Sequence, residues 1–121
     1  MSAWLWIAVA VVGGTGASAR FLLDRAIARR VGRAFPLGTL TINTTGSLVL
    51  GLLTGLAVSG DLLIIAGTAT IGSYTTFSTW MLETQRLSEE GELAGALLNL
   101  SVTLVVGVAA AALGRAIGAH A

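Results

Sequence analysis

Charge is absent from four long stretches of this chain, and that distribution limits the folds open to it. Residues 1–19, 37–60, 62–82 and 93–114 contain no Asp, Glu, Lys or Arg. Hydrophobic residues make up 55% of the sequence and charged residues only 11%, whereas soluble domains carry roughly 25% charged residues. Because a helix that spans a bilayer needs about 20 mostly apolar residues, each stretch predicts one membrane span.

These stretches predict an all-α membrane protein with a single transmembrane domain of four helices over residues 1–121. A basic connection over residues 24–35 is expected to lie as a short helix at the membrane surface. Because no basic residue precedes the first stretch, we interpret it as a mature span and not as a cleaved signal peptide. The expected spans are residues 3–23, 37–59, 62–86 and 93–117.

The third stretch has an unusual centre for a membrane helix. Residues 72–80 read Gly-Ser-Tyr-Thr-Thr-Phe-Ser-Thr-Trp. Backbone groups freed inside a membrane are tolerated only where protein or a cavity satisfies them, and ion sites are often built at such interruptions. The motif therefore predicts a third helix that is broken near the midplane of the bilayer and exposes carbonyl groups.

Asn43 is the strongest candidate site residue outside this motif. It lies inside the uncharged second stretch, where a buried amide needs partners. Two interpretations stay open: an interhelical hydrogen bond, or a donor that faces a pore. The same ambiguity applies to the hydroxyls of the third stretch, which can also bond back to their own helix. It applies as well to Asn99 and Thr103, which share one face of the fourth stretch.

Phe77 and Trp80 lie three residues apart and therefore share a helix face. Such a pair is usually core packing. Aromatic rings carry a positive edge, however, so two rings beside hydroxyl and amide donors can also solvate an anion without a formal cation. Arg20 has two interpretations as well: a partner of Asp24 in an ion pair at the interface, or an anion-attracting group at the mouth of a pore.

The sequence lacks the residue patterns of most other functions. It contains no cysteine, which excludes disulfides and thiolate metal sites. No nucleophile has a base partner inside a predicted span, and no glycine-rich loop follows a strand to cradle phosphate. The net charge is only +1, and the arginine-rich connection has no interleaved aromatic residues. Catalysis and nucleic-acid binding are therefore not expected.

Three blocks of residues combine the motifs above with their neighbours. They are Gly13-Gly14-Thr15-Gly16-Ala17 with Arg20, Pro36-Leu37-Gly38-Thr39-Leu40 with Asn43 and Gly46, and residues 72–79 with Glu83. Together these blocks resemble the small bacterial fluoride channels of the CrcB/Fluc family. The resemblance covers nearly the whole chain, and the order of the blocks, the length and the four predicted spans agree with it. A lone glycine pair would be a weak signal, but three blocks in register are specific.

The resemblance implies a fluoride-selective channel in the bacterial plasma membrane that exports fluoride passively. It implies a dimer of four-helix subunits in opposite orientations, with two narrow pores along the subunit interface. A structural sodium ion, which is not transported, would be held at the centre by backbone carbonyls of Gly72 and Thr75 from both subunits. By motif position, the residues implied to line the pore are Asn43, Phe77, Ser78, Trp80 and, with a weaker alignment, Thr103.

Three positions depart from the family pattern. Trp80 stands where the family has its second phenylalanine; the indole keeps a ring edge, adds an N–H donor and is bulkier. Ser73 replaces a common glycine, and Asn99 replaces a common tyrosine. None of the three removes the sodium carbonyls or Asn43, so the departures bear on conduction rate.

Two alternatives to a fluoride channel stay open. One is a small four-helix exporter of cationic drugs, which needs an ionisable carboxylate inside a span; the first stretch has none. The other is a non-conducting subunit that only assembles with another membrane protein. Purified protein in liposomes separates the three interpretations.

The distribution of arginine bears on the partner. Six of the seven arginines lie on the side of the first and third connections, and only Arg115 lies on the side of the two termini. Because basic residues stay on the cytoplasmic side, this bias predicts that most copies insert with both termini outside. The second subunit of an antiparallel dimer is therefore expected to be an inverted copy of this chain or an oppositely oriented paralogue. The arginines on the other side, in the first and third connections, are Arg20, Arg25, Arg29, Arg30, Arg33 and Arg86.

Overall fold

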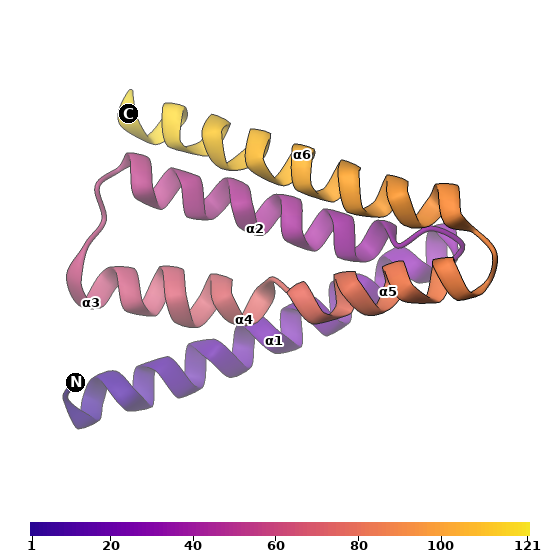
Figure 1. The fold of residues 1–121 in the computed structure, drawn as a ribbon. Helices are drawn as coiled ribbons and strands as arrows, with labels where there is room; N and C mark the ends of the chain where they lie inside the picture. Colours follow the sequence, from indigo (N-terminus) through magenta and orange to yellow (C-terminus); the bar gives the residue numbers. More distant parts are fainter.

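The computed structural model describes residues 1–121, and every regular element in it is helical. The all-α fold predicted from the charge distribution is therefore confirmed. Three elements are long helices, and the third segment of the chain is divided into shorter ones (Figure 1). The long helices are α1 (Ala3–Val31), α2 (Leu37–Gly55) and α6 (Leu93–Ala119). The third segment comprises α3 (Gly60–Leu62), the π-helix η1 (Leu63–Ile71), α4 (Gly72–Tyr74) and α5 (Phe77–Glu89).

The first helix is longer than its predicted span. It continues without interruption to Val31, and the chain leaves it at Gly32 with φ 77°. No proline or glycine lies between the expected span end and Gly32, so nothing in the sequence stops the helix earlier. The prediction of a separate surface helix over residues 24–35 is wrong, because residues 24–31 belong to α1 and the remainder is an irregular connection.

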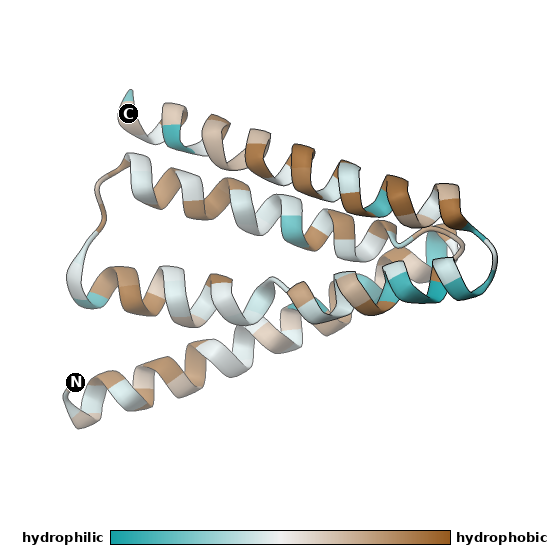
Figure 2. Ribbon diagram, viewed as in Figure 1, coloured by the Kyte–Doolittle hydropathy of each residue, from teal (hydrophilic) through white to brown (hydrophobic).

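The helices run back and forth along one axis, and both chain ends lie at the same end of the molecule (Figure 1). Helices α1, α2 and α6 are each long and apolar enough to cross a membrane. Hydrophilic colour gathers on α5 and the loop that follows it, whereas α6 is mostly hydrophobic (Figure 2). The third segment is not one continuous helix, because it is interrupted at Thr75 and Thr76.

Helices α2 and α6 pack against each other through glycine. A Cβ atom added at Gly51 would overlap the backbone of Ala111, and one added at Gly114 would overlap the backbone of Leu48. Gly55 and Gly118 make similar backbone contacts one turn further along the pair. Small residues allow helix backbones to approach closely where lipid supplies no hydrophobic driving force. The two helices therefore form a close-packed pair along most of their length.

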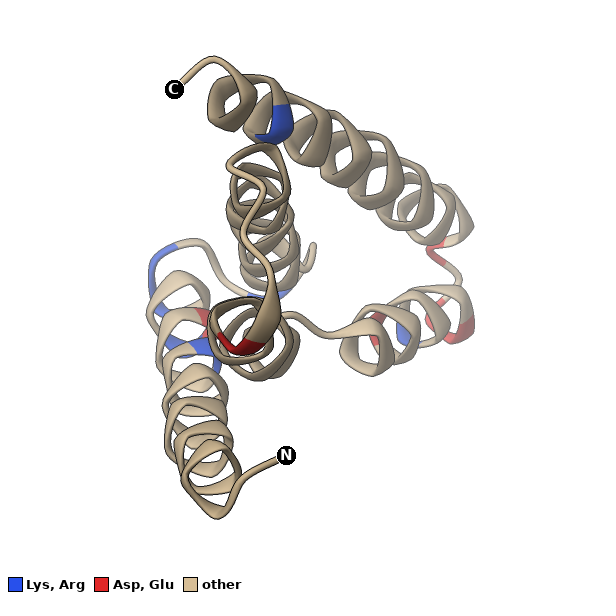
Figure 3. Ribbon diagram, turned by 90° about the vertical axis from the view of Figure 1, so that its left-hand side faces the viewer, with Lys and Arg blue, Asp and Glu red and all other residues tan.

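Helix α5 lies apart from the rest of the third segment. In the view along the helices it is displaced sideways from η1 and α1 (Figure 3). Its packing neighbours are α6 and, to a small extent, α2. The π-helix η1 and α4 pack instead on α1, where a Cβ atom at Gly16 would meet the Thr70 carbonyl oxygen. The break therefore divides the third segment between two sides of the molecule.

Candidate pore site at the helix break

Thr75 and Thr76 form the break in the third segment. Their backbones are extended, with φ −79° and ψ 159° at Thr75 and φ −147° and ψ 122° at Thr76. The Thr76 hydroxyl accepts a hydrogen bond from the Thr79 N–H at 3.2 Å, which is the N-cap contact that starts α5. The predicted interruption of the third helix is confirmed. Thr76, three residues before Thr79, is the residue in the sequence that marks where the interruption ends and α5 begins.

Asn43 on α2 closes the break with both ends of its side-chain amide. Its Oδ1 accepts from the Thr76 N–H at 2.8 Å, and its Nδ2 donates to the Thr76 carbonyl oxygen at 2.9 Å. An extended residue between two helices has no backbone partner for either group, and an unsatisfied buried pair is costly. Of the two interpretations of Asn43, the interhelical hydrogen bond is therefore present. One amide N–H stays free, because the amide carries two.

The break also releases two carbonyl groups from their helical partners. In a continuous α-helix the N–H of residue i+4 binds the carbonyl of residue i. The Thr76 N–H, which would bind the Gly72 carbonyl, donates to Asn43 instead. The Thr79 N–H, which would bind the Thr75 carbonyl, donates to the Thr76 hydroxyl. These are the two oxygens that the family resemblance assigns to sodium, so the backbone here fits a cation site.

Gly46 is a positioning residue that the sequence analysis named only as part of the block with Asn43. A Cβ atom at this position would overlap the Thr75 side-chain methyl. Gly46 lies three residues after Asn43 and therefore on the same face of α2. Its missing side chain lets α2 approach the break closely enough for the Asn43 amide to reach Thr76.

Phe77 and Trp80 form an edge-to-face pair directly after the break. Their ring centroids are 5.7 Å apart and the planes meet at 88°, a favoured geometry for aromatic rings. The Trp80 indole N–H donates to the Asn99 backbone carbonyl at 3.1 Å. The extra donor that tryptophan brings in place of phenylalanine is therefore already bound to α6, and the indole offers its neighbours carbon-bound hydrogens only.

A groove of about 760 Å³ runs along the face that α2, the third segment and α6 share. Its wall contains no acidic, basic or histidine side chain. Polar groups come from Ser47, Thr54 and Thr68 as well as from the predicted site. Six of the eight residues predicted to serve the pore or the sodium ion line this one groove: Asn43, Gly72, Thr75, Phe77, Trp80 and Thr103.

Ser78 and Arg20 do not line the groove. The Ser78 hydroxyl lies 3.4 Å from that of Thr76 and is exposed. Arg20 forms no ion pair; Asp24 pairs with Arg33 instead, with 3.2 Å between Nη1 and Oδ2. The Arg20–Asp24 ion pair, which was one interpretation of these residues, is therefore absent. The proposed pore roles of Ser78 and Arg20 stay predictions.

Two buried oxygens on α6 lack hydrogen-bond partners. They are Thr103 Oγ1 and Asn99 Oδ1, and Thr103 borders the groove. Since Asn99 and Thr103 are four residues apart, the two groups lie one turn apart on one face. The Thr103 hydroxyl is thus a buried group without a hydrogen-bond partner, on a residue that borders the groove.

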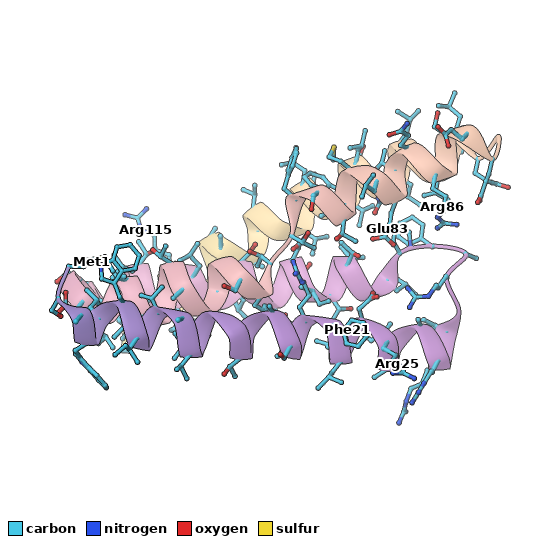
Figure 4. The ribbon with its side chains drawn as sticks, turned by 90° about the horizontal axis from the view of Figure 1, so that it is seen from below. Met1, Phe21, Arg25, Glu83, Arg86 and Arg115 are labelled. Carbon is cyan, nitrogen blue, oxygen red and sulfur yellow. The ribbon has the colours of Figure 1, made fainter.

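The charged side chains gather at the ends of the helices. Arg115 lies at the end that also holds the N-terminal Met1, and Arg25, Glu83 and Arg86 lie toward the other end (Figure 4). At this second end the buried Thr39 hydroxyl donates to the Glu83 carboxylate, which ties α2 to α5. The Arg86 guanidinium donates to the Arg33 carbonyl at 3.0 Å.

Comparison with known proteins confirms the resemblance predicted from the three blocks. A family model described as CrcB-like protein, Camphor Resistance (CrcB), matches residues 7–115. The chain is 55% identical to the fluoride-specific ion channel FluC 2 of Mycobacterium bovis over 111 residues, which cover 92% of this chain and 88% of the relative. The protein of that name in Mycobacterium tuberculosis gives the same values. The fluoride-specific ion channel FluC 1 of Symbiobacterium thermophilum is 40% identical over 119 residues, 93% of this chain and 96% of the relative.

The match extends over nearly all of the chain and includes every residue of the break and of the groove. This chain therefore belongs to the CrcB family of multi-pass membrane proteins.

Proposed function

We propose that this chain forms a fluoride-selective channel, not an enzyme, and that fluoride passes along the groove between α2, the broken segment and α6. The observation that carries the proposal is the lining of that groove. It combines an amide, several hydroxyls and two aromatic rings with no charged side chain. Relatives of matching length are named as fluoride-specific ion channels. Passive flow through such a channel would export fluoride and protect the cell from its toxicity.

Neutral donors suit fluoride because the anion is small and strongly hydrated. A pore must replace its lost water with short hydrogen bonds or with positive ring edges. Asn43 has one free N–H, and the Thr103 hydroxyl has no partner. The Phe77 ring is 70% exposed and stands in the groove wall. Larger halides form longer hydrogen bonds and would lose more of their solvation on entry.

The open groove implies a second subunit. Polar groups inside a membrane face protein or a water-filled cavity and not lipid, yet the groove is open along one side. A second four-helix subunit in the inverted orientation would cover it, so that each groove is one wall of a pore at the interface. That subunit is a second copy of this chain or an oppositely oriented paralogue.

A structural sodium ion fits the centre of this dimer. The carbonyl oxygens of Gly72 and Thr75 from each subunit would hold it, since both have lost their helical partners. Carbonyl oxygens are suitable ligands for a hard cation such as sodium. When bound, the ion would supply a fixed positive charge that offsets the cost of an anion within the membrane.

The experiment that tests the function is fluoride efflux from liposomes that contain the purified protein. We expect fluoride to leave the liposomes, and chloride to be retained, without an added energy source. A proton-coupled exporter would instead take up cations in response to a pH gradient. Well-folded protein that carries neither ion, alone or mixed with an oppositely charged paralogue, would refute the channel.

A separate labelling experiment tests the partner. Single cysteines at Ala28 and Ala121 would report the two sides of the membrane, since the parent has no cysteine. The arginine bias predicts that Ala28→Cys is labelled mainly from inside and Ala121→Cys mainly from outside. Comparable labelling of each position from both sides of intact cells would show that one sequence inserts both ways and needs no paralogue.

A further inference from the structure

The strongest unassigned feature outside the break is the polar connection between α5 and α6, and Asn99 takes part in all of it. Its backbone carbonyl accepts from the Trp80 indole N–H at 3.1 Å. Its side-chain Nδ2 donates to the Thr84 hydroxyl at 2.9 Å and lies 3.5 Å from the Trp80 carbonyl oxygen. The side chain is wholly buried. No other side-chain hydrogen bond joins α5 to α6.

These contacts hold residue 80 at two points. The Thr84 hydroxyl, which accepts from Asn99, donates to the Trp80 carbonyl oxygen at 2.8 Å. The Asn99 side chain is therefore linked to the backbone of Trp80 through Thr84, whereas the indole N–H binds the Asn99 backbone carbonyl. The side-chain bonds hold α5 against α6, and this placement brings the indole N–H to that backbone carbonyl and limits the rotation of the ring.

Helix α5 depends on such a connection because it has few other neighbours. It follows the break, is displaced from η1 and α1 (Figure 3), and packs mainly on α6. The position of α5 sets where the Phe77 and Trp80 rings stand, and both rings border the groove. Their perpendicular arrangement, with centroids 5.7 Å apart, depends on the orientation of the indole.

We propose that Asn99 is a positioning residue: with Thr84 it holds α5 against α6, which keeps the Trp80 indole N–H on the Asn99 backbone carbonyl and so sets the ring edges that the groove presents to fluoride. Asn99 does not itself border the groove; it acts through Trp80. The proposal rests on the proposed function for its effect on fluoride, but the contacts that define it can be tested without ion flow.

The test uses Asn99→Leu, Thr84→Val and, as the matched control, Thr84→Ser. Valine has nearly the shape of threonine without the hydroxyl, whereas serine keeps the hydroxyl. We expect Asn99→Leu and Thr84→Val each to lower fluoride efflux roughly tenfold, the size of effect typical of residues coupled through contact. Fluoride selectivity over chloride should fall with it, and Thr84→Ser should keep parental efflux and selectivity.

A second background separates positioning from general destabilisation. In Trp80→Ala the ring is already gone, so Asn99→Leu should lower efflux no further. An equal fold-loss in both backgrounds would overturn the proposal, as would parental efflux and selectivity in Thr84→Val. If Asn99→Leu does not assemble, the Thr84 pair of variants gives the same comparison at a half-buried position.

Fluorescence provides a readout that does not depend on transport. Replacing Trp4 and Trp6 with phenylalanine leaves Trp80 as the one tryptophan of the chain. Thr84→Val should then lower the anisotropy of the indole relative to Thr84→Ser, because the ring gains freedom. Unchanged anisotropy would overturn the proposal even in a conducting protein. If the anisotropy clearly decreases in a protein that carries no fluoride, the result supports the positioning role of Asn99 and Thr84 and contradicts only the channel function.

Discussion

The α2–α6 pair and the broken third segment are held together by different kinds of contact. Between α2 and α6, glycines bring two backbones together, as at Gly51 with Ala111 and Gly114 with Leu48, and no side-chain hydrogen bond joins the two helices. The break and α5 are held instead by side-chain amides and hydroxyls, chiefly those of Asn43 and Asn99.

The difference shows how a chain of this size can be stable although the backbone of its third segment is interrupted inside the membrane. Close glycine packing supplies many small attractive contacts between the two backbones and needs no hydrogen bond between side chains. The break needs the opposite arrangement, because extended residues in a membrane leave donors and acceptors that must be paired. The glycine-packed pair forms a frame, and single amides attached to that frame determine the geometry of the site.

The largest effect is expected where the frame itself is filled. Gly114→Ala would place a methyl group into the Leu48 backbone, and overpacking of this kind costs about 1–3 kcal/mol of unfolding free energy. Gly107→Ala, on the same helix, meets only the Ser47 hydroxyl at 3.7 Å and serves as the control. Thermal unfolding in detergent measures both. Equal stability of the two variants would mean that the helices are not in backbone contact.

The next effect is expected at the break. Asn43→Ala should lower fluoride efflux tenfold or more while subunit assembly persists, because the Thr76 N–H and carbonyl oxygen both lose their hydrogen-bond partner. Asn43→Asp should be similarly impaired: its carboxylate would face the Thr76 carbonyl oxygen and add negative charge to an anion path. Efflux from liposomes and size-exclusion chromatography check the two statements. Full efflux in either well-folded variant would remove Asn43 from the pathway.

A smaller, graded effect is expected at the ring beside the break. Trp80→Phe should conduct better than Trp80→Ala, because phenylalanine keeps a ring edge toward the groove and loses only the hydrogen bond to Asn99, worth about 1 kcal/mol. Efflux rates of the two variants in matched liposomes test this order. If Trp80→Ala conducts as well as the parent, the ring at this position is only packing.

The smallest effect is expected at the exposed end of the molecule. Arg33→Gln removes the ion pair with Asp24. The Arg33 side chain is 64% exposed and that of Asp24 is 31% exposed. Exposed pairs contribute about 0–1 kcal/mol, so unfolding temperature and efflux should stay close to parental values. A large loss would show that the connection before α2 supports the site, in addition to the frame and the amides.

The sequence alone determined the class of the protein and the location of its break. Charge-free stretches of bilayer length predict membrane helices because hydrocarbon tolerates few charges, and the glycine and threonine cluster at residues 72–79 predicts an interrupted third helix. The sequence also identified candidate site residues, because a polar side chain inside a membrane span needs a hydrogen-bond partner and paired aromatic rings can face an anion. These candidates are Asn43, Phe77, Trp80 and Thr103. The length of α1 was misjudged because an arginine-rich segment without glycine or proline can continue a helix beyond the apolar stretch.

Only the tertiary structure decided which groups each candidate contacts. The sequence left Asn43 undecided between a structural bond and a pore donor, and the structure shows two bonds to Thr76 with one N–H to spare. It suggested an added donor at Trp80, which the Asn99 carbonyl occupies. It gave Gly46 no role of its own, whereas the structure places Gly46 against the Thr75 side-chain methyl. Each of these outcomes depends on contacts between residues far apart in the chain, and helical periodicity reports only which residues share a face of one helix.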